Sequence, residues 1–380
     1  MKIGIVTLYD NNNFGNRLQN YAVQKYFEGK GFQTETFKHK DRPSTLKLIC
    51  HWIAVPIHFL LRSTEYEKIR LKKIYSRAGR EQTIAGFTSQ YIKCGPYIRN
   101  YRFPKCIREK YDFSVSGGDQ VWHCWSGRRR ELKFYFLSFA DQRKRITIAP
   151  SFGFDKFPKK NLKTYKRGLS GFEHLSVREE RGAELINELT GKEATVLLDP
   201  TMLVDTSEWQ KILRKPSQYA DENYILVYAL DGFKGDVKNK TCSLAVDLSL
   251  QVIDIMDTDS DYYMHTRPDE FLYWIQHARL VVTDSFHACV FSILFSRPFV
   301  VIDRAEHKGM ESRLDTLFHK LKIADRHIDE LKEGFEITGE VRDRLLATDY
   351  DTVAGILEKE RTKADNFYRV CFADKEGSSI

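Results

Sequence analysis

The sequence has 380 residues and a formal net charge of +8. Apolar residues make up 42% and charged residues 29%, which excludes disordered, collagen-like and multispan membrane proteins and predicts a water-soluble chain of about two domains. The seven cysteines form no CxxC pair, and their odd number argues against a closed disulfide framework. Because the amino terminus also lacks the pattern of a secretion signal, we expect a cytoplasmic protein.

Positive charge is concentrated in the first half of the sequence. Residues 38–167 hold 30 Lys and Arg against 10 Asp and Glu, a balance of +20, so the rest of the chain carries −12. Such a balance suits nucleic acid, an anionic membrane surface or a phosphorylated small molecule, or describes a merely solvated surface. Residues 46–61 are mostly apolar but too few to span a bilayer, and a basic stretch follows at 62–73. This pattern predicts a buried helix or a helix at a membrane interface.

Short β-branched or aromatic runs alternate with helical stretches, beginning with a strand at 3–8 and a helix at 16–28. Further strands are predicted at 32–37, 112–115, 145–149, 174–177 and 194–198, with helices at 162–172 and 180–189. The alternation restarts with predicted strands at 224–230, 251–255, 279–283 and 298–302. One predicted helix ends near residue 249, and three others cover 268–278, 286–295 and 311–321. Strands that alternate with helices indicate parallel sheets.

We therefore predict an α/β fold of two doubly wound, Rossmann-like domains that face a cleft. The first covers residues 1–217 and contains a basic, partly apolar insertion at about 38–110. The second covers residues 218–345, and a charged helical tail at 346–380 packs back on the first domain. Parallel sheets bind ligands at the carboxyl ends of their strands, so the polar loops after the strands are the candidate sites.

Two such loops lie in the first part of the chain. After the first strand comes a run of carboxamides that includes Asn13 and Asn16, which can bond sugar hydroxyls or a phosphate, or form a turn and an N-cap. The second loop reads SGGDQVW at residues 116–122. Its paired glycines allow a ligand to approach the backbone closely, Asp119 can act as a base or hold a hydroxyl, and Trp122 offers a face to a sugar ring. A structural turn is the alternative.

Two further loops carry charged or titratable side chains. Residues 176–180 read SVREE at a strand-to-helix junction, where Arg178 can bind an anion together with a helix N-terminus or pair with a neighbouring glutamate. Residues 283–290 read TDSFHACV, and His287 falls in the first turn of an apolar helix. The helix dipole favours the neutral imidazole there, so His287 is either a proton donor or acceptor or a structural histidine.

These loops combine into a family resemblance. The loop with Asn16, GGDQVW at 117–122, SVRE at 176–179, LDPT at 198–201 and TDSFHACVFSILF at 283–295 together resemble the polysaccharide pyruvyl transferase family. The motifs span about residues 3–303, and their order is more specific than any one of them. The resemblance implies a fold similar to GT-B glycosyltransferases. It also implies phosphoenolpyruvate as the donor and, as the product, a pyruvate ketal on a sugar of an envelope or capsular polysaccharide or its lipid-linked precursor.

The resemblance also implies residue roles. Arg178 and His287 match the family's arginine and histidine, so we expect Arg178 to bind the donor and His287 to protonate its methylene carbon as the general acid. Asp119 is expected to orient or deprotonate the acceptor hydroxyl. The acceptor is expected on the first domain and the donor on the second. The predicted acceptor-binding residues are Asn13, Asn16, Gln120 and Trp122.

One position departs from the family pattern. Some branches of the family have an arginine two residues before the histidine, where this chain has Ser285. A serine can donate one hydrogen bond to the donor but brings no charge, so a cation must come from elsewhere. The predicted donor-binding candidates are Arg267, Arg304 and Lys308, and Arg313 is also available on a nearby segment.

Other functions stay open at this point. A GT-B nucleotide-sugar glycosyltransferase would use the same two domains and a basic cleft. Tyrosines among the lysines and arginines of the basic segment suggest a non-catalytic protein that binds nucleic acid or another anionic polymer, but no nucleic-acid motif accompanies them, so we expect no such partner. We expect this segment and residues 46–61 to contact a lipid-linked acceptor at the inner face of the membrane.

Neither a metal nor a cofactor is expected. The aspartates at positions 257, 259 and 261 resemble a metal-binding DxD motif, but Tyr262 and Pro268 occupy positions where a calcium loop needs Gly and Glu. We interpret this triplet as a solvated loop. The sequence leaves open the acceptor sugar, the linkage of the ketal and the oligomeric state.

Overall fold

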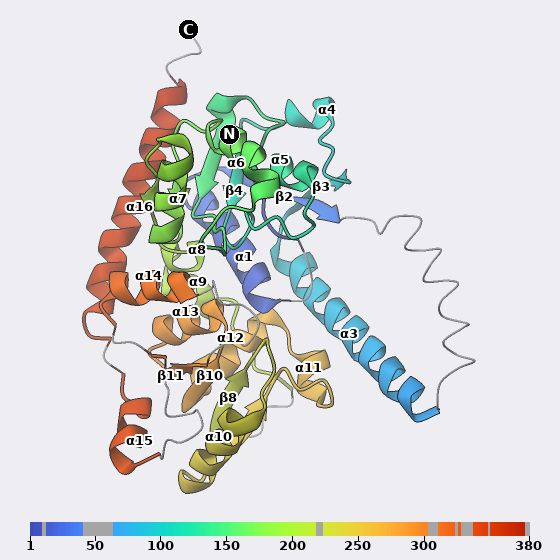
Figure 1. The fold of residues 1–380 in the computed structure, drawn as a ribbon, viewed down its shortest axis with the longest axis vertical. Helices are drawn as coiled ribbons and strands as arrows, with labels where there is room; N and C mark the ends of the chain where they lie inside the picture. The colour runs from blue at the N-terminus through green and yellow to red at the C-terminus, as the bar shows by residue number, and fades with distance from the viewer. Residues whose placement is uncertain are drawn as a thin grey trace.

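The computed structural model describes residues 1–9, 13–40, 64–217, 223–302, 311–323, 326–327, 337–348 and 350–376. Its two larger sheets lie in different halves of the molecule, the first in the upper half of Figure 1 and the second in the lower half. The chain passes from the first half to the second between α9 (Thr206–Gln210) and β8 (Tyr224–Tyr228), so the predicted boundary near residue 217 falls between them.

The first sheet has the strand order β3-β2-β1-β4-β5 within the described residues, and all its neighbours are parallel. Its strands are β1 (Lys2–Val6), β2 (Gln33–Lys40), β3 (Cys94–Arg99), β4 (Phe113–Gly117) and β5 (Arg145–Ile148). The chain starts in the middle of the sheet, extends it to one side, and then crosses back to add β4 and β5. The strand order therefore reverses between β1 and β4, where Ile3 pairs with Phe113.

Helices and a small strand pair surround this sheet. They are α1 (Phe14–Glu28), α3 (Thr64–Tyr91), α4 (Lys105–Arg108), α5 (Arg129–Tyr135), η1 (Gln142–Lys144), η2 (Lys159–Asn161), α6 (Leu162–Leu169), α7 (Glu180–Thr190) and α8 (Pro200–Leu203), with the parallel pair β6 (Ser176–Val177) and β7 (Thr195–Val196). Local signals fix several ends: Gly191 ends α7 with a left-handed φ of 70°, and Asp199 caps α8 with Pro200 at its first turn.

The second sheet has the order β11-β10-β8-β9 within the described residues, and it is also parallel. Its remaining strands are β9 (Gln251–Asp254), β10 (Leu280–Thr283) and β11 (Phe299–Val301), and its helices are α10 (Gly235–Asp247), α11 (Asp261–His265), α12 (Pro268–His277), α13 (Phe286–Leu294), α14 (Glu311–Leu321) and α15 (Gly339–Leu346). The central strands β8 and β10 are buried along their whole length, which explains their continuous apolar sequences. The order reverses between β8 and β10.

Helix α1 joins the two halves through aromatic contacts. The ring of Phe14 stacks on Tyr228 of β8 at 5.6 Å and lies 5.0 Å from Phe271 of α12. One apolar core runs from Ile3 in the first sheet to Val281 in the second. The predicted α/β fold with two Rossmann-like parallel sheets is confirmed.

The last helix, α16 (Val353–Glu376), returns to the first sheet and runs along one side of the molecule (Figure 1). The hydroxyl of Tyr368 donates to the carbonyl of Thr147 in β5 at 3.1 Å. Asp365 accepts from the hydroxyl of Tyr26 in α1 at 2.7 Å. The carboxyl end of the chain therefore forms part of the amino-terminal half.

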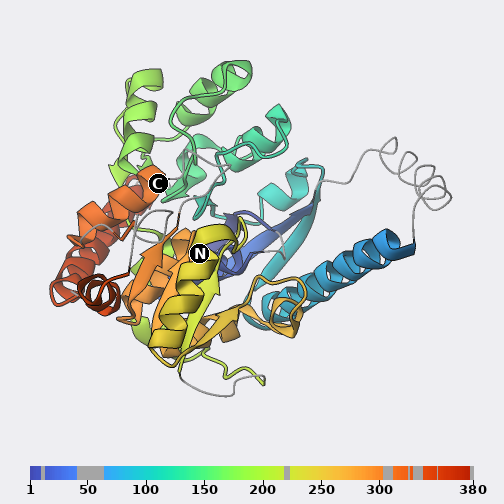
Figure 2. The ribbon, with the colours of Figure 1, turned by 60° about the horizontal axis from the view of Figure 1, so that its bottom comes forward.

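Helix α3 extends away from the body of the molecule (Figures 1 and 2). Its carboxyl-terminal part is anchored by Ile84 and Phe87 in the core, whereas Ile74 and Tyr75 are exposed. The predicted apolar segment 46–61 lies outside the described residues. No helix in the described part of the chain is both long and apolar enough to cross a bilayer.

Candidate active site

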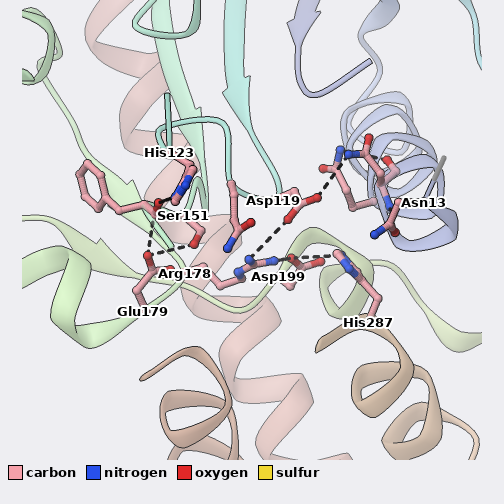
Figure 3. Close-up of polar contacts among 12 residues, drawn as sticks. Asn13, Asp119, His123, Ser151, Arg178, Glu179, Asp199 and His287 are labelled. Atoms are coloured by element: carbon pink, nitrogen blue, oxygen red, sulfur yellow. Dashed lines mark hydrogen bonds and ion pairs between the residues drawn. The ribbon is translucent and has the colours of Figure 1, made fainter. Parts of the chain in front are cut away.

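The strand order reverses between β1 and β4 in the first sheet and between β8 and β10 in the second. The segments that follow β1, β4 and β10 lie close together. Ligands of parallel sheets bind at the carboxyl ends of strands where the order reverses, because the adjacent loops diverge there. The loop after β4 contributes Asp119, the start of α1 contributes Asn13, and the start of α13 contributes His287; Figure 3 shows these residues around Arg178. On the second sheet, Asp284 accepts from the backbone N–H groups of Leu230 and Asp231 at 2.8 and 2.9 Å, which ties the loops after β8 and β10 together.

Arg178 lies at the centre of this cluster, buried between two carboxylates and an aromatic ring. Its Nη1 donates to Asp199 Oδ2 at 2.6 Å, and its Nη2 lies 3.7 Å from Asp119 Oδ1. The guanidinium stands over the ring of Phe286, 4.2 Å from its centroid. Its Nε and Nη2 are buried and have no hydrogen-bond partner among the described residues. This edge is the fork with which an arginine binds a carboxylate or phosphate through two hydrogen bonds.

His287 faces the same aspartate from the second sheet. Its Nε2 lies 3.9 Å from Asp199 Oδ2, is buried, and has no hydrogen-bond partner among the described residues. The other side of the ring packs against Gly15 at the start of α1, where a Cβ atom would overlap the imidazole. Asp199 itself is held by Thr201, whose backbone N–H and hydroxyl donate to Oδ1 at 3.0 and 2.7 Å. Asp199 therefore links the guanidinium to the imidazole.

The charges of this cluster determine its protonation states. Burial lowers the pKa of His287, and nearby Arg178 adds to the shift, so the pKa stays below its usual value despite the opposing effect of Asp199. Burial alone would raise the pKa of Asp199, but Arg178, His287 and the hydrogen bonds from Thr201 together outweigh it, and the pKa is lowered. Burial likewise disfavours charged Arg178, yet Asp199 and Asp119 raise its pKa. At neutral pH the cluster therefore contains a charged ion pair beside a neutral imidazole.

The amino-terminal side of the site is a network of hydrogen bonds. Asn13 caps α1 by accepting from the backbone N–H of Asn16 at 3.3 Å. The Asn16 amide donates to Asp119 Oδ2 at 3.4 Å, and its oxygen accepts from Arg17 Nη2 at 2.8 Å. Arg17 also donates to the carbonyl of Leu8. The structure thus brings together the predicted site residues Asn13, Asn16 and Asp119.

The glycines of the second loop bring it close to protein rather than to a ligand. Gly117 and Gly118 have φ values of 146° and 58°. A Cβ at Gly117 would overlap the carbonyl of Ile148, and one at Gly118 would overlap the amide of Gln19. Only glycine combines these backbone angles with such close contacts. The pair therefore fixes the path of the loop that carries Asp119.

Arg313 supplies a second cation from α14. Its guanidinium lies 5.8 Å from the centroid of the Phe286 ring, on which Arg178 also rests. With the Gln120 amide turned so that its oxygen faces Arg313, that oxygen accepts from Nη1 and Nη2 at 3.2 and 3.3 Å. Ser285 is the N-cap residue of α13 and is 3% exposed. Gln120 and Ser285 therefore lie beside the cluster, and Arg313 is the cation found there.

Two predicted residues have other surroundings. Trp122 is completely buried and packs against Phe136 and Phe152, so the expectation that it offers a face to a sugar is wrong. Arg267 does not join the cluster, because it caps α12 and donates through Nε and Nη2 to Asp269 at 2.9 Å. The predicted donor-binding residues Arg304 and Lys308 lie outside the described residues.

Sequence reasoning assigned no role to three side chains that shape the site. Asp199 was visible in the LDPT motif, but its partners are distant in the sequence. Glu179 follows Arg178 and accepts from the Ser151 hydroxyl at 3.0 Å and the Phe152 backbone N–H at 2.8 Å, which positions the neighbouring loop. Arg17 lies within the carboxamide run. The signal in the sequence was that each of the three is a charged residue within or next to one of the motifs.

The central side chains of the site are almost completely buried, which limits the access of a ligand. Arg178 and His287 are 3% and 5% exposed, so an anion reaches them only when neighbouring side chains or loops shift. A shallow hollow of about 840 Å³ lies elsewhere, near the start of β5, and none of the predicted site residues lines it. The described residues include no group of three or more side chains suited to hold a metal ion.

Three comparisons with known proteins were informative to different degrees, and the family model agrees with the motifs. The family model described as "Polysaccharide pyruvyl transferase" matches residues 13–306. No curated protein matches the chain at a significant level. Similar solved structures include UDP-GlcNAc 2-epimerase from Neisseria meningitidis (10% identity, 96% of this chain and 100% of that chain, TM-score 0.45) and MnaA from S. aureus, solved with UDP (10%, 96% and 97%, 0.48). Another is ADP-heptose LPS heptosyltransferase II from E. coli (11%, 95% and 99%, 0.38).

Proposed function

Because this chain belongs to the polysaccharide pyruvyl transferase family, we propose that it transfers pyruvate from phosphoenolpyruvate to a sugar of a cell-envelope or capsular polysaccharide or its lipid-linked precursor, forming a pyruvate ketal. The observation that carries the proposal is the meeting of two buried groups. A guanidinium edge of Arg178 and the Nε2 of His287, neither with a hydrogen-bond partner among the described residues, lie around one carboxylate.

Arg178 suits the donor because phosphoenolpyruvate carries both a carboxylate and a phosphate. Asp199 occupies only Nη1, so the buried Nε and Nη2 edge can make two parallel hydrogen bonds to one of these groups once the neighbouring side chains or loops shift. Arg313, whose guanidinium also lies near the Phe286 ring, supplies the charge that Ser285 lacks. The carboxylates of Asp119 and Asp199 balance the charges of Arg178 and Arg313, so a trianion has to be held by directed hydrogen bonds from both arginines.

His287 is proposed as the general acid. The resting imidazole is neutral, but a bound trianion raises its pKa and favours uptake of a proton with the donor. Transfer of this proton to the methylene carbon of the donor breaks its C=C double bond and makes C2 an oxocarbenium-like centre. A sugar hydroxyl attacks C2 and loses its proton, phosphate leaves, and a second hydroxyl closes the ketal. The two hydroxyl protons restore the acid and protonate the released phosphate.

Asp119 is proposed to orient or deprotonate the attacking hydroxyl. Its side chain is 14% exposed, more than Arg178 at 2% and Asp199 at 0%, so it lies on the more accessible side of the cluster. Asn16 fixes Oδ2, which leaves Oδ1 directed toward Arg178. Asn13 and Asn16 extend this side with amide groups that suit sugar hydroxyls.

Product analysis with alternative donors tests the proposed function. The purified protein is incubated with an envelope glycan fraction and either phosphoenolpyruvate or a panel of nucleotide sugars. We expect phosphate release that depends on the glycan, together with a product whose mass increases by pyruvate minus one water. Release of a nucleoside diphosphate would assign a glycosyltransferase instead, and binding of the glycan without turnover of any donor would indicate a non-catalytic protein.

We further propose that the protein works at the inner face of the cytoplasmic membrane. The excess positive charge of residues 38–167 and the exposed side chains of Lys72, Lys73, Ile74 and Tyr75 on the extended helix α3 support this placement. Co-sedimentation at low salt is expected with vesicles that contain phosphatidylglycerol and not with pure phosphatidylcholine vesicles. Equal recovery in the two supernatants would contradict membrane contact.

A further inference from the structure

An exposed tryptophan lies on the same loop as the candidate catalytic carboxylate. Asp119 stands at the start of this loop, 3.7 Å from the guanidinium of Arg178. Six residues later, Trp125 is 54% exposed. The other tryptophans in the described ranges, Trp122, Trp209 and Trp274, are at most 1% exposed. Trp125 therefore places a large aromatic surface in solvent close to the site.

The indole of Trp125 is held in a fixed orientation. Its Nε1 donates to the carbonyl of Gln120 at 3.2 Å, and its ring lies on His123 with centroids 4.2 Å apart and an interplanar angle of 39°. His123 is itself held by Phe152, whose carbonyl accepts from Nδ1 at 3.1 Å (Figure 3). A ring fixed in this way loses little conformational entropy when a ligand stacks on it.

The backbone on either side of Trp125 is also braced. The preceding residue, Cys124, is buried and has a left-handed φ of 63°. The following residue, Ser126, donates through its backbone N–H and its hydroxyl to Glu131 Oε2 at 2.9 and 2.6 Å. The exposure of Trp125 is thus a property of an ordered loop.

Gln120 connects this surface to the anion-binding groups. Its carbonyl fixes Trp125, and its side-chain oxygen accepts from Arg313, whose guanidinium lies against the ring of Phe286. A ligand that contacts both regions can therefore place one part on the indole and another beside Arg178 and His287. This continuity distinguishes Trp125 from the exposed tyrosines Tyr75 and Tyr97, which lie on α3 and β3.

We propose that Trp125 and His123 form an aromatic shelf on which a pyranose ring of the acceptor glycan stacks. A pyranose presents a face of C–H groups, which carry partial positive charge and pack favourably on the electron-rich face of an indole. The shelf assigns to Trp125 the aromatic contact that the sequence pattern had assigned to Trp122. The inference rests on the proposed function, because it places the acceptor of that reaction.

Saturation-transfer NMR of the full-length protein tests the shelf without depending on tryptophan fluorescence. The probes are the methyl glycosides of glucose, galactose, mannose, N-acetylglucosamine and N-acetylgalactosamine, in both anomeric forms. Irradiation of aromatic protons is expected to saturate the ring C–H groups of at least one glycoside. The Trp125→Ala variant is expected to bind that glycoside about 3- to 10-fold more weakly, and Trp125→Phe to keep most of the affinity. Tyr97→Ala, which removes a 46% exposed ring elsewhere, is the matched control.

Calorimetry with phosphoenolpyruvate separates failure of the shelf from failure of the proposed function. Unchanged donor affinity in Trp125→Ala, together with weaker sugar binding, supports the shelf. Equal sugar binding by the wild type and Trp125→Ala, or no binding of any glycoside to the wild type, overturns it and leaves the donor reaction standing. A wild type that binds a glycoside through Trp125 but not phosphoenolpyruvate refutes the donor and keeps the shelf. A change of oligomeric state in Trp125→Ala with unaltered sugar binding would assign the indole to a protein interface and overturn the shelf.

Discussion

The two halves of the molecule contribute different kinds of groups to the site. The amino-terminal half supplies charged and amide side chains that hydrogen bonds hold in place, such as Asp119, Asn16 and Glu179. The carboxyl-terminal half supplies His287 on an apolar helix, and its Nε2 has no hydrogen-bond partner among the described residues. Under the proposed function, the first half holds most of the charged and amide groups in place, whereas the second half adds Arg313 and presents the imidazole that takes up and delivers a proton.

Replacement of the imidazole should give the largest effect on rate. His287→Gln removes the titrating ring but keeps a polar side chain of similar reach. We expect the rate of glycan-dependent phosphate release to fall about 10²- to 10⁴-fold, because a general acid contributes this much. His319→Gln, on an exposed histidine of α14, should leave the rate unchanged and serves as the control. Turnover of His287→Gln near the wild-type rate would remove His287 from the chemistry.

Breaking the central ion pair should give the largest effect on stability. Either Arg178→Met or Asp199→Asn leaves one buried charge without its partner, so we expect the free energy of unfolding to fall by about 3–5 kcal/mol in urea titrations. The double variant should recover part of this loss because no uncompensated charge remains. Arg181→Met, which breaks exposed pairs on α7, should cost less than about 1 kcal/mol. Equal losses for Arg178→Met and Arg181→Met would contradict the central role of this pair.

A smaller change tests the contact between the two halves. Gly15→Ala places a methyl group where the His287 ring lies, so the imidazole or the start of α1 must move. We expect a loss of about 1–3 kcal/mol in the free energy of unfolding and a lower kcat, while calorimetry shows a smaller change in donor affinity. Gly29→Ala, at the other end of α1 where φ is −62°, is the matched control and should be tolerated. Wild-type kcat in Gly15→Ala would show that the ring position is not critical.

The smallest expected effect is a difference in the pH dependence of stability. The pKa of His287 is lower in the folded protein than its usual 6.5, so the unfolded chain binds this proton first as the pH falls. Below pH 6.5 the wild type should therefore lose stability faster than His287→Gln, by at most about 1.4 kcal/mol per pH unit. His39, which is buried with a pKa of about 4, contributes equally to both proteins and cancels in the comparison. Parallel urea-stability curves between pH 7 and 5 would contradict a buried neutral imidazole.

The sequence predicted the alternating elements better than the side-chain surroundings. Strand and helix periodicity identified the two parallel sheets, but β3 was missed because its sequence, CGPYIR, contains Gly and Pro. Helix α3 was missed because its sequence is rich in charged residues, and its apolar core residues among those described, such as Ile84 and Phe87, lie in its second half. Both elements depend on packing against distant parts of the chain, which local patterns do not encode.

The site shows the same limit. The motifs identified Arg178, His287 and Asp119, since each follows a predicted strand, but they did not identify Asp199 as the link between the first two. Arg178 and Asp199 are 21 positions apart in the sequence, and they come into contact only when α7 and β7 fold between them. Spacing likewise could not distinguish Trp122, which points into the core, from Trp125, which is exposed.

The return of α16 to the first sheet has a consequence for protein synthesis. Tyr26 and Asp365 are 339 positions apart, and Phe372 packs against Phe32 and Phe113. Until the ribosome has made α16, Phe32 and Phe113 lack their contacts with Phe372. The nascent amino-terminal half is therefore expected to need a chaperone, or to remain prone to aggregation, until the final helix emerges from the exit tunnel.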